Sequence, residues 1–341
     1  MRAVLPLLTA ALLTLAAPAA ATEACGGTHV VQNDETLRDI AVRYYGDARK
    51  WSALYYANAA ELEGQLGDLQ PGTELQIQCL DTANGPEATT PLQDPDAELR
   101  MLTGGNYPPF TDQDLPNKGL ITEIVNAAME AAPYPVSFAI DWNDAWSEHL
   151  FPLLDEHRYD MGFPWLQPNC PNPKNERCRN FHFSDPLFEM LILLFARADN
   201  PIPFAKDADI IGKTLCRPAG YYTHDLDRAD RQWITKNLVT LRTPDTPDAC
   251  FDLLMQGEVD AVALNEFLGR SKIHELGLDQ DVVALDRPVS IEGLHLVISK
   301  THPRGTTHRY RFNAGMAKLK DSQRFQEIVG RHLSRFWDSV E

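Results

Sequence analysis

Apolar and polar residues change their periodicity several times along the chain, and these changes divide it into segments. Residues 4–15 are almost continuously apolar. Residues 25–80 start with a short β-prone run, continue with apolar residues at helical spacing, and end with the alternation of a half-buried strand at 74–78. Residues 81–97 are rich in Pro, Asp and Thr without periodicity, which is typical of a linker. The second segment therefore predicts a small β-α-α-β unit.

From residue 98 to the end, predicted strands alternate with predicted helices. Strands are predicted at 99–103, 137–140, 159–163, 191–196, 213–217, 260–264 and 294–299. Helices are predicted at 121–132, 146–154, 250–256 and 314–333. Alternation of this kind predicts an α/β fold with mainly parallel strands, either as one barrel-like domain or as two lobes.

The first apolar run has the features of a secretory signal peptide. A basic Arg2 precedes it, and small residues ending in Ala19-Ala20-Ala21 follow it. The run is too short to cross a bilayer, which takes about 20 residues. A lipid-modified Cys25 is the alternative, but Glu23 stands where small apolar residues would be expected. We expect residues 1–21 to be removed near Ala21 and the product to be periplasmic.

The six cysteines indicate disulfide bonds if the protein is exported. There are 15 possible connectivities, yet the cysteines fall into three neighbouring pairs along the chain. We therefore expect three local, structural disulfides. The expected pairs are Cys25 with Cys79, Cys170 with Cys178, and Cys216 with Cys250.

Charge and motif content exclude several classes of function. The chain has 31 Lys and Arg against 48 Asp and Glu, a net charge of −17, which disfavours binding to nucleic acid or an anionic membrane surface. Its 10 histidines form no H-x-x-x-H pair, and no G-x-S-x-G or Gly-rich phosphate loop occurs. We expect a protein that is not an enzyme and that needs no cofactor and no metal.

Residues 25–80 resemble a LysM domain, a module that binds N-acetylglucosamine-containing glycans. The resemblance is carried by 29–31, 34–37, 40–41, 44–47, Trp51, Asn58, Leu69, Pro71, Gly72 and Leu75. It implies a glycan groove formed by Asp34, Glu35 and Thr36 on one side and by Gly67, Asp68 and Leu69 on the other. Asn33 departs from the family's usual glycine and changes the backbone that would approach a sugar. A spacer or protein-contact role for this domain is the alternative.

Residues 98–341 resemble the family 3 extracellular solute-binding proteins, which have the type II periplasmic-binding fold. The motifs are Tyr107-Pro108-Pro109-Phe110, Gly119-Leu120 with Glu123-Ile124, Pro152-Leu153-Leu154, Glu176-Arg177, Phe183-Ser184-Asp185-Pro186, Gly212-Lys213, Ala219-Gly220 and Val259-Asp260-Ala261-Val262. The resemblance implies a first lobe of about 98–195 and 290–341 and a second lobe of about 196–289. The strands that cross between the lobes are expected near 195–199 and 288–293, with a solute held between the lobes.

The family's ligand contacts can be carried over to matching positions. Tyr107 and Phe110 match the aromatic wall, Arg177 the arginine that takes a ligand carboxylate, and Gly220 and Thr223 an anion-contacting turn at a predicted helix start. Trp165 is a further candidate for the wall. Asn265, with Glu266 beside it, stands where the family has the acid that pairs with a ligand ammonium. In addition, residues 167–170 replace the hydroxyl-bearing turn that the family has before Arg177. Both departures argue against an ordinary α-amino-acid site.

The resemblance implies an exported protein that captures a small polar solute, amino-acid-like or carboxylate-bearing, for an inner-membrane ABC permease. In this hypothesis, the N-terminal segment tethers the protein to peptidoglycan. The alternative is an envelope protein that binds muropeptides or protein partners without transport. A third possibility is an enzyme similar to cyclohexadienyl dehydratase, in which Glu266 would act as a general acid.

Overall fold

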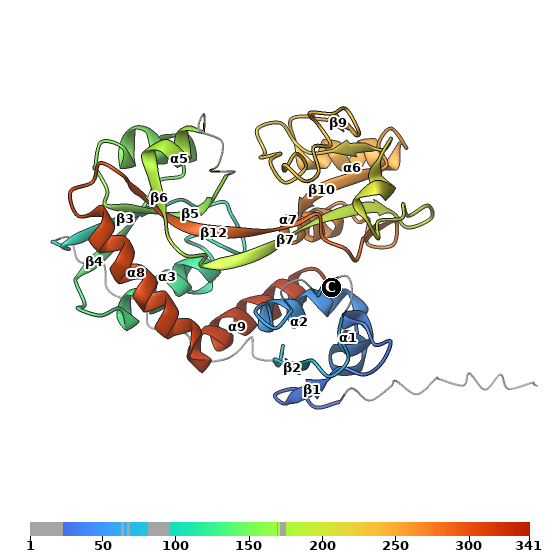
Figure 1. Ribbon diagram of the computed structural model, residues 1–341, viewed down its shortest axis with the longest axis horizontal. Helices are drawn as coiled ribbons and strands as arrows, with labels where there is room; N and C mark the ends of the chain where they lie inside the picture. Colours follow the sequence, from blue (N-terminus) through green and yellow to red (C-terminus); the bar gives the residue numbers. More distant parts are fainter. Residues whose placement is uncertain (1–22, 63–64, 67–68, 81–95, 169, 171–174) are drawn as a thin grey trace, which may run out of the picture.

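The computed structural model describes residues 23–62, 65–66, 69–80, 96–168, 170 and 175–341 (Figure 1). The predicted signal peptide and most of the predicted linker lie outside these residues, as do Gly67 and Asp68. In the described part of the chain, no helix is long and apolar enough to cross a membrane.

The first described segment, residues 23–80, is called here the N-terminal module. It has the predicted β-α-α-β order: β1 (Thr28–Val30), α1 (Leu37–Tyr45), α2 (Trp51–Ala57) and β2 (Glu74–Gln76), with β1 and β2 antiparallel. α1 starts at a capping box, in which Thr36 accepts from the backbone of Asp39 and Asp39 accepts from that of Thr36. Gly46, with φ 72°, ends this helix in a left-handed conformation that favours glycine.

The rest of the chain forms two lobes that share one continuous, mixed sheet (Figure 1). The strands of the first lobe are β3 (Leu99–Thr103), β4 (Phe138–Trp142), β5 (Met161–Leu166) and β6 (Phe181–Phe183). Those of the second lobe are β8 (Thr214–Cys216), β9 (Thr240–Arg242), β10 (Ala261–Asn265) and β11 (Val282–Ala284). The pairs β3–β4, β3–β5, β8–β10 and β8–β9 are parallel, so each lobe has the predicted parallel character.

Helices cover these strands. The first lobe carries α3 (Leu120–Ala131), α4 (Trp146–Glu148), α5 (Glu176–Asn180), α8 (Gly305–Lys320) and α9 (Gln323–Ser339). The second lobe carries α6 (Pro247–Met255) and α7 (Glu266–Glu275). α3 is buried along most of its length between the sheet and α8, as its mainly apolar sequence requires.

Two long antiparallel strands, β7 (Phe188–Arg197) and β12 (Ser290–Ser299), connect the lobes. Their mutual pairing runs from Phe188–Leu294 to Ile192–Ser290. Beyond it, Phe195 already pairs with residues of the second lobe, Val262 and Ala284. The crossing on β7 therefore lies before the expected 195–199, because this strand begins earlier than its apolar run suggested.

Three predicted helical features differ in the structure. The predicted helix 146–154 is kinked, because α4 is followed by a π-helical turn at His149–Leu154 in which Phe151, the residue before Pro152, leaves helical geometry (φ −133°). The predicted helix 314–333 is two helices, separated where Ser322 adopts an extended conformation (ψ 153°). Turns replace the helix start predicted at Gly220 and Thr223.

The structure contains all three expected disulfide bonds. Cys25–Cys79 joins the two ends of the N-terminal module, Cys170–Cys178 precedes and enters α5, and Cys216–Cys250 joins β8 to α6. Each bond therefore connects neighbouring parts of one module or lobe.

The N-terminal module packs behind the crossing strands and contacts both lobes (Figure 1). Tyr56 from α2 is 5% exposed, with its ring 4.9 Å from that of Phe188 on β7 and 5.6 Å from that of Phe267 on α7. α2 also packs on α9 of the first lobe. The module therefore lies against the region about which the lobes would rotate.

Candidate functional site

A cleft of about 640 Å³ lies between the lobes, in front of the crossing strands. Its first-lobe wall comes from the loop after β3, from β5 and from α5. Its second-lobe wall comes from the loop after β8, from the end of β10 and from α7. Loops at the carboxyl ends of parallel strands are where open α/β sheets place ligand-binding groups. The volume falls within the usual range for small-molecule sites.

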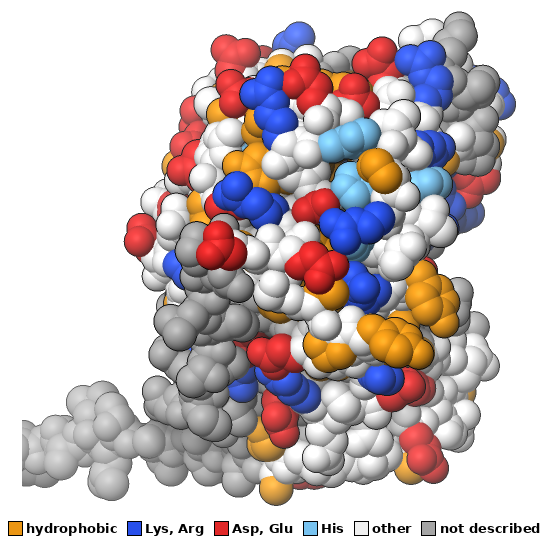
Figure 2. All heavy atoms as spheres, turned by 90° about the vertical axis from the view of Figure 1, so that its left-hand side faces the viewer, with side chains coloured by type: hydrophobic (Ala, Val, Ile, Leu, Met, Phe, Trp, Pro, Cys, Tyr) orange, Lys and Arg blue, Asp and Glu red, His pale blue; other side chains and the backbone are white. Residues whose placement is uncertain are grey.

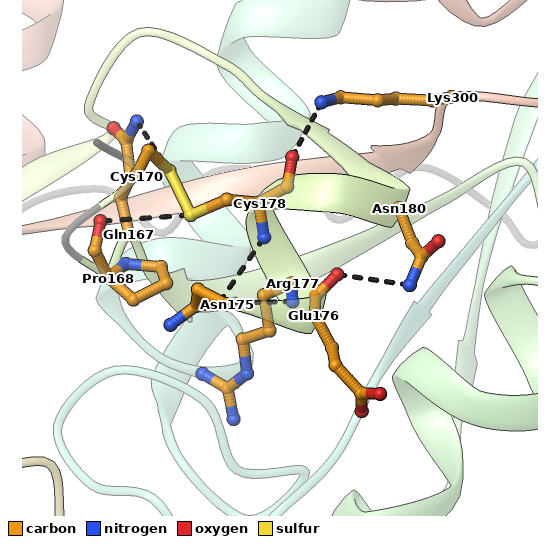
Figure 3. The surroundings of a disulfide bond; sticks show 9 residues. All are labelled: Gln167, Pro168, Cys170, Asn175, Glu176, Arg177, Cys178, Asn180 and Lys300. Atoms are coloured by element: carbon orange, nitrogen blue, oxygen red, sulfur yellow. Dashed lines mark hydrogen bonds between the residues drawn. A yellow bond between two sulfur atoms is a disulfide. The ribbon is translucent and has the colours of Figure 1, made fainter. Parts of the chain in front are cut away.

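The short helix α5 carries Arg177 and is fixed at both sides (Figure 3). Asn175 caps it, because its Oδ1 accepts from the backbone N–H of Arg177 at 3.1 Å and of Cys178 at 3.3 Å. The Cys170–Cys178 bond and a 2.5 Å hydrogen bond from Lys300 Nζ to the Cys178 carbonyl hold the other side. Figure 3 shows the Arg177 side chain directed away from the disulfide.

The guanidinium of Arg177 lies between two aromatic rings of opposite lobes. Its central carbon is 4.8 Å from the ring centroid of Trp165 on β5 and 4.6 Å from that of Tyr222 in the second lobe. Burial lowers the pKa of this arginine, while the neighbouring Tyr222 raises it less. Stacking holds the planar group in place and leaves its edge free for a bidentate contact to an anion.

The other charged groups on the cleft wall are already paired. Arg217 forms a buried bidentate ion pair with Asp225, and it also donates to the carbonyls of Ala263 and Tyr222. The sequence analysis did not identify this pair, although an arginine directly after a buried strand was a possible signal.

The remaining acidic residues of the cleft wall also have charged or histidine partners. His224 Nε2 lies 2.9 Å from Glu292, and Lys272 Nζ lies 2.6 Å from Glu275. Among the described residues that line the cleft, Arg177 is the charged side chain whose ionic group has no hydrogen bond or ion pair. The described part of the cleft wall thus offers one free positive group.

Asn265 presents donors to the cleft. It is the N-cap of α7, and its Oδ1 accepts from the backbone N–H of Leu268 at 3.0 Å. Capping uses one of the two lone pairs of this oxygen, and the amide N–H groups have no acceptor among the described residues. The neutral amide offers a ligand ammonium no charged partner.

Aromatic residues supply much of the remaining wall. They are Tyr107, Trp146, Trp165, Tyr221 and Tyr222. The indole N–H of Trp165 is buried and has no hydrogen-bond partner among the described residues. Apolar side chains from β7, β10 and β12 complete the floor, including Met190, Leu264 and Leu294. This surface fits a ligand with an apolar or planar part.

The structure brings five of the eight expected ligand residues to the cleft. They are Tyr107, Trp165, Arg177, Gly220 and Asn265. Phe110, Thr223 and Glu266 are not on its wall. Phe110 is fully buried beside the crossing strands, with its ring 5.2 Å from that of Phe267. Thr223 lies in the turn that follows Tyr222, where His224 and Asp225 provide the wall residues instead.

Glu266 faces the N-terminal module rather than the cleft. It is 1% exposed, accepts a 3.0 Å hydrogen bond from the Tyr56 hydroxyl, and forms a 2.7 Å ion pair with Arg270 one turn along α7. The position one residue after the N-cap sends its side chain to the back of the lobe. The expectation that Glu266 contacts a solute is corrected by this arrangement.

A second hollow, the module groove, lies between the N-terminal module and the second lobe. Its volume is about 860 Å³. Four of the expected glycan residues line it: Asp34, Glu35, Thr36 and Leu69. The opposite wall includes Phe204 and Arg287, whose guanidinium lies 4.6 Å from the centroid of the Phe204 ring. Gly67 and Asp68 lie outside the described residues.

A two-lobed α/β domain whose lobes are joined by two crossing strands, with a cleft at the crossing, defines the type II periplasmic-binding-protein fold. A model of the bacterial extracellular solute-binding proteins, family 3, matches residues 99–335. The chain belongs to this family.

Solved structures agree with this fold. The periplasmic VFT2 domain of BvgS from Bordetella pertussis is 17% identical, with a TM-score of 0.50 over 68% of this chain and 92% of that domain. The GluR0 ligand-binding core in complex with L-glutamate is 18% identical, with a TM-score of 0.50 over 69% of this chain and 97% of that one. No curated protein matches the chain in sequence. The N-terminal module lies outside the matched residues.

Proposed function

We propose that this protein captures a small, carboxylate-bearing solute between its two lobes. The observation that carries the proposal is Arg177, a stacked and unpaired guanidinium on a cleft wall where the other charged groups have partners. The side chain of Asn265 favours the same class of ligand, since its amide N–H groups can donate to a carboxylate and it carries no charge to pair with an ammonium. A carboxylate attached to a planar or apolar body fits both the guanidinium and the aromatic wall.

Delivery to an ABC permease belongs to the same proposal. It is supported by membership of a solute-binding family, and the predicted signal peptide agrees with export to the compartment where such permeases collect their solutes. An enzyme role has less support, because Glu266 faces the module and the acids of the cleft wall are held in ion pairs.

Titration calorimetry with matched ligands tests the binding proposal. We expect aromatic and aliphatic carboxylates without an α-ammonium group to bind more tightly than the corresponding amino acids and amides. Arg177→Ala should weaken binding of the best carboxylate at least about 10- to 100-fold, which corresponds to the loss of a charge-assisted bidentate contact.

Arg179→Ala is the matched control. Arg179 lies on the same helix, but its guanidinium is exposed and pairs with Glu176 at 3.3 Å. Its removal should leave affinity unchanged. Equal affinities for wild type and Arg177→Ala would refute the role of Arg177, and failure of every carboxylate to bind would refute the ligand class.

A second candidate function, tethering to peptidoglycan, is favoured by the module groove. Four of the residues expected to contact a glycan line a groove of about 860 Å³, and Phe204 of the second lobe lies on its opposite wall. Phe204→Ala should therefore reduce retention on purified peptidoglycan, while Tyr134→Ala, at an 85% exposed site elsewhere, should not. Equal retention of wild type and Phe204→Ala would contradict a groove that uses both walls.

A further inference from the structure

A second group of chemically active side chains lies at the edge of the first lobe that faces away from the cleft. Asp160 comes directly before β5, and His302 and His308 come between the end of β12 and the first turns of α8. The cleft residue Trp165 is near the other end of β5. A strand of 6 residues is about 17–20 Å long. The group is therefore separate from the solute cleft.

The three side chains converge on one point. One ligand atom from each lies within 4.8 Å of the other two. Asp160 Oδ1 is 3.0 Å from His302 Nε2. Ligand atoms around a tetrahedral Zn²⁺ ion stand about 3.4 Å apart, given bond lengths of about 2.1 Å. Small shifts of these side chains would bring the distances between the three ligand atoms to the values found in a metal site.

His308 supplies independent evidence for a missing ligand. Its side chain is 1% exposed, its Nδ1 lies 3.3 Å from Arg311, and its Nε2 is buried without a hydrogen-bond partner among the described residues. A buried polar atom without a partner costs about 1–3 kcal/mol. Because an arginine can only donate, His308 Nδ1 accepts from Arg311, and coordination through Nε2 would move the ring proton to Nδ1 and release that contact.

The surroundings support the group and also set its affinity. Asp160 Oδ2 accepts from the backbone N–H of Arg100 at 2.8 Å, which orients the carboxylate. His302 Nδ1 accepts from the backbone N–H of Arg304 at 3.2 Å. Coordination through Nε2 would move the proton of this ring to Nδ1 and release that contact. We therefore expect an affinity below that of a structural zinc site.

Histidine side chains gather on this side of the first lobe (Figure 2). His157 lies near the group of three, with its ring centroid 5.2 Å from that of His302 and its Nε2 2.9 Å from the Thr301 hydroxyl. Acidic and basic side chains are mixed around the histidines on this face, so no excess of negative charge would draw a cation to it.

We propose that Asp160, His302 and His308 bind one divalent transition-metal ion, with Zn²⁺ as the best match, through one carboxylate oxygen and two imidazole nitrogens. Imidazole ligands select Zn²⁺ and its neighbours over Mg²⁺ and Ca²⁺, which prefer oxygen. Three protein ligands leave a fourth position for water.

The test uses the full-length mature protein after treatment with a chelator and removal of the chelator. Titration calorimetry with Zn²⁺ should show one site, and Zn²⁺ should raise the thermal midpoint in a concentration-dependent way. His302→Ala and Asp160→Asn should each weaken Zn²⁺ binding at least about 100-fold, since the loss of a ligand exceeds the effect of losing a supporting group. Mg²⁺ should not compete.

Two features keep the test decisive. His302 and Asp160 are partly exposed, so these variants avoid the buried His308. His274→Ala is the control, because His274 is a partly exposed histidine of the second lobe that pairs with Asp279 and should not contribute. Absence of Zn²⁺ binding by the wild type overturns the proposal, and so does equal binding by wild type, His302→Ala and Asp160→Asn.

Discussion

Single residues at the cleft owe their roles to neighbours that are distant in sequence. Arg177 and Asn265 could be located from the sequence, because short motifs mark their positions. The stacking of the Arg177 guanidinium and the capping bond of Asn265 could not be predicted. These features depend on Tyr222 crossing from the other lobe and on the start of α7. The prediction that Glu266 contacts the solute is wrong for a related reason. One position along a helix turns a side chain by about 100°, so the residue after Asn265 faces the N-terminal module.

A pH-dependent ion pair belongs to this residue scale. Burial alone would lower the pKa of His224, but the hydrogen bond and charge of Glu292 outweigh it, so the pKa of His224 is raised. The pair's contribution to stability is then complete below the ordinary histidine pKa of about 6.5 and is lost as the pH rises through the higher pKa of the folded protein.

We therefore expect His224→Gln to lower the free energy of unfolding by about 1.5 kcal/mol more at pH 6 than at pH 9. Urea unfolding of wild type and variant at both pH values measures this difference. His274→Gln, at a more exposed pair, is the control and should cost less than about 0.5 kcal/mol. A His224→Gln effect that is constant or grows with pH would contradict the assignment.

At the scale of elements, the strands were predicted better than the helices. Buried strands such as β3 and β10 are short apolar runs, and these appear directly in the sequence. The division between α8 and α9 could not be read in this way, because Asp321 and Ser322 are tolerated within helices. The break depends on Ser322 leaving helical geometry as α9 turns back over α3.

The packing of α3 against α9 depends on one buried acid. Glu123 is 2% exposed and accepts from Arg331, from His332 Nε2 at 2.7 Å and from Asn117 at 2.8 Å. Burial would raise the pKa of Glu123, but the bonds and charges of His332 and Arg331 together outweigh it and lower the pKa. The carboxylate is therefore ionised in the folded protein near neutral pH.

Glu123→Gln should destabilise the protein by about 3 kcal/mol, because it leaves the buried Arg331 without a counter-charge. Glu130→Gln is a matched control on the same helix, since Glu130 pairs with Arg324 of α9 at the surface. It should cost less than about 1 kcal/mol. Denaturant unfolding distinguishes the two, and equal losses would show that burial of the pair is unimportant.

At the scale of the whole molecule, the family resemblance predicted the two lobes, but nothing in the sequence placed the N-terminal module. Its position depends on surfaces far apart in the chain. Lys50 pairs with Glu341, Arg38 pairs with Asp286, and the Tyr56 hydroxyl accepts from the backbone N–H of Leu191 at 3.3 Å. Such contacts have no local signature, so a predicted linker at 81–97 suggested a more independent module.

These contacts predict that module and lobes unfold together. Calorimetry should show one cooperative transition, and Tyr56→Phe should lower stability by about 1–3 kcal/mol because it removes a buried hydroxyl that bonds both Glu266 and Leu191. Tyr310→Phe, at a 73% exposed site, should change little. Two separate transitions in the wild type would show that the module is independent.

The placement of the module also determines which way the cleft faces. In Figure 1 the module lies below β7 and β12, on the side opposite the cleft, whereas α5, which lines the cleft, lies above them. A surface that holds the protein by its N-terminal module would therefore hold it from behind. The mouth of the cleft would point outward, open to diffusing solutes and to a docking partner at the same time.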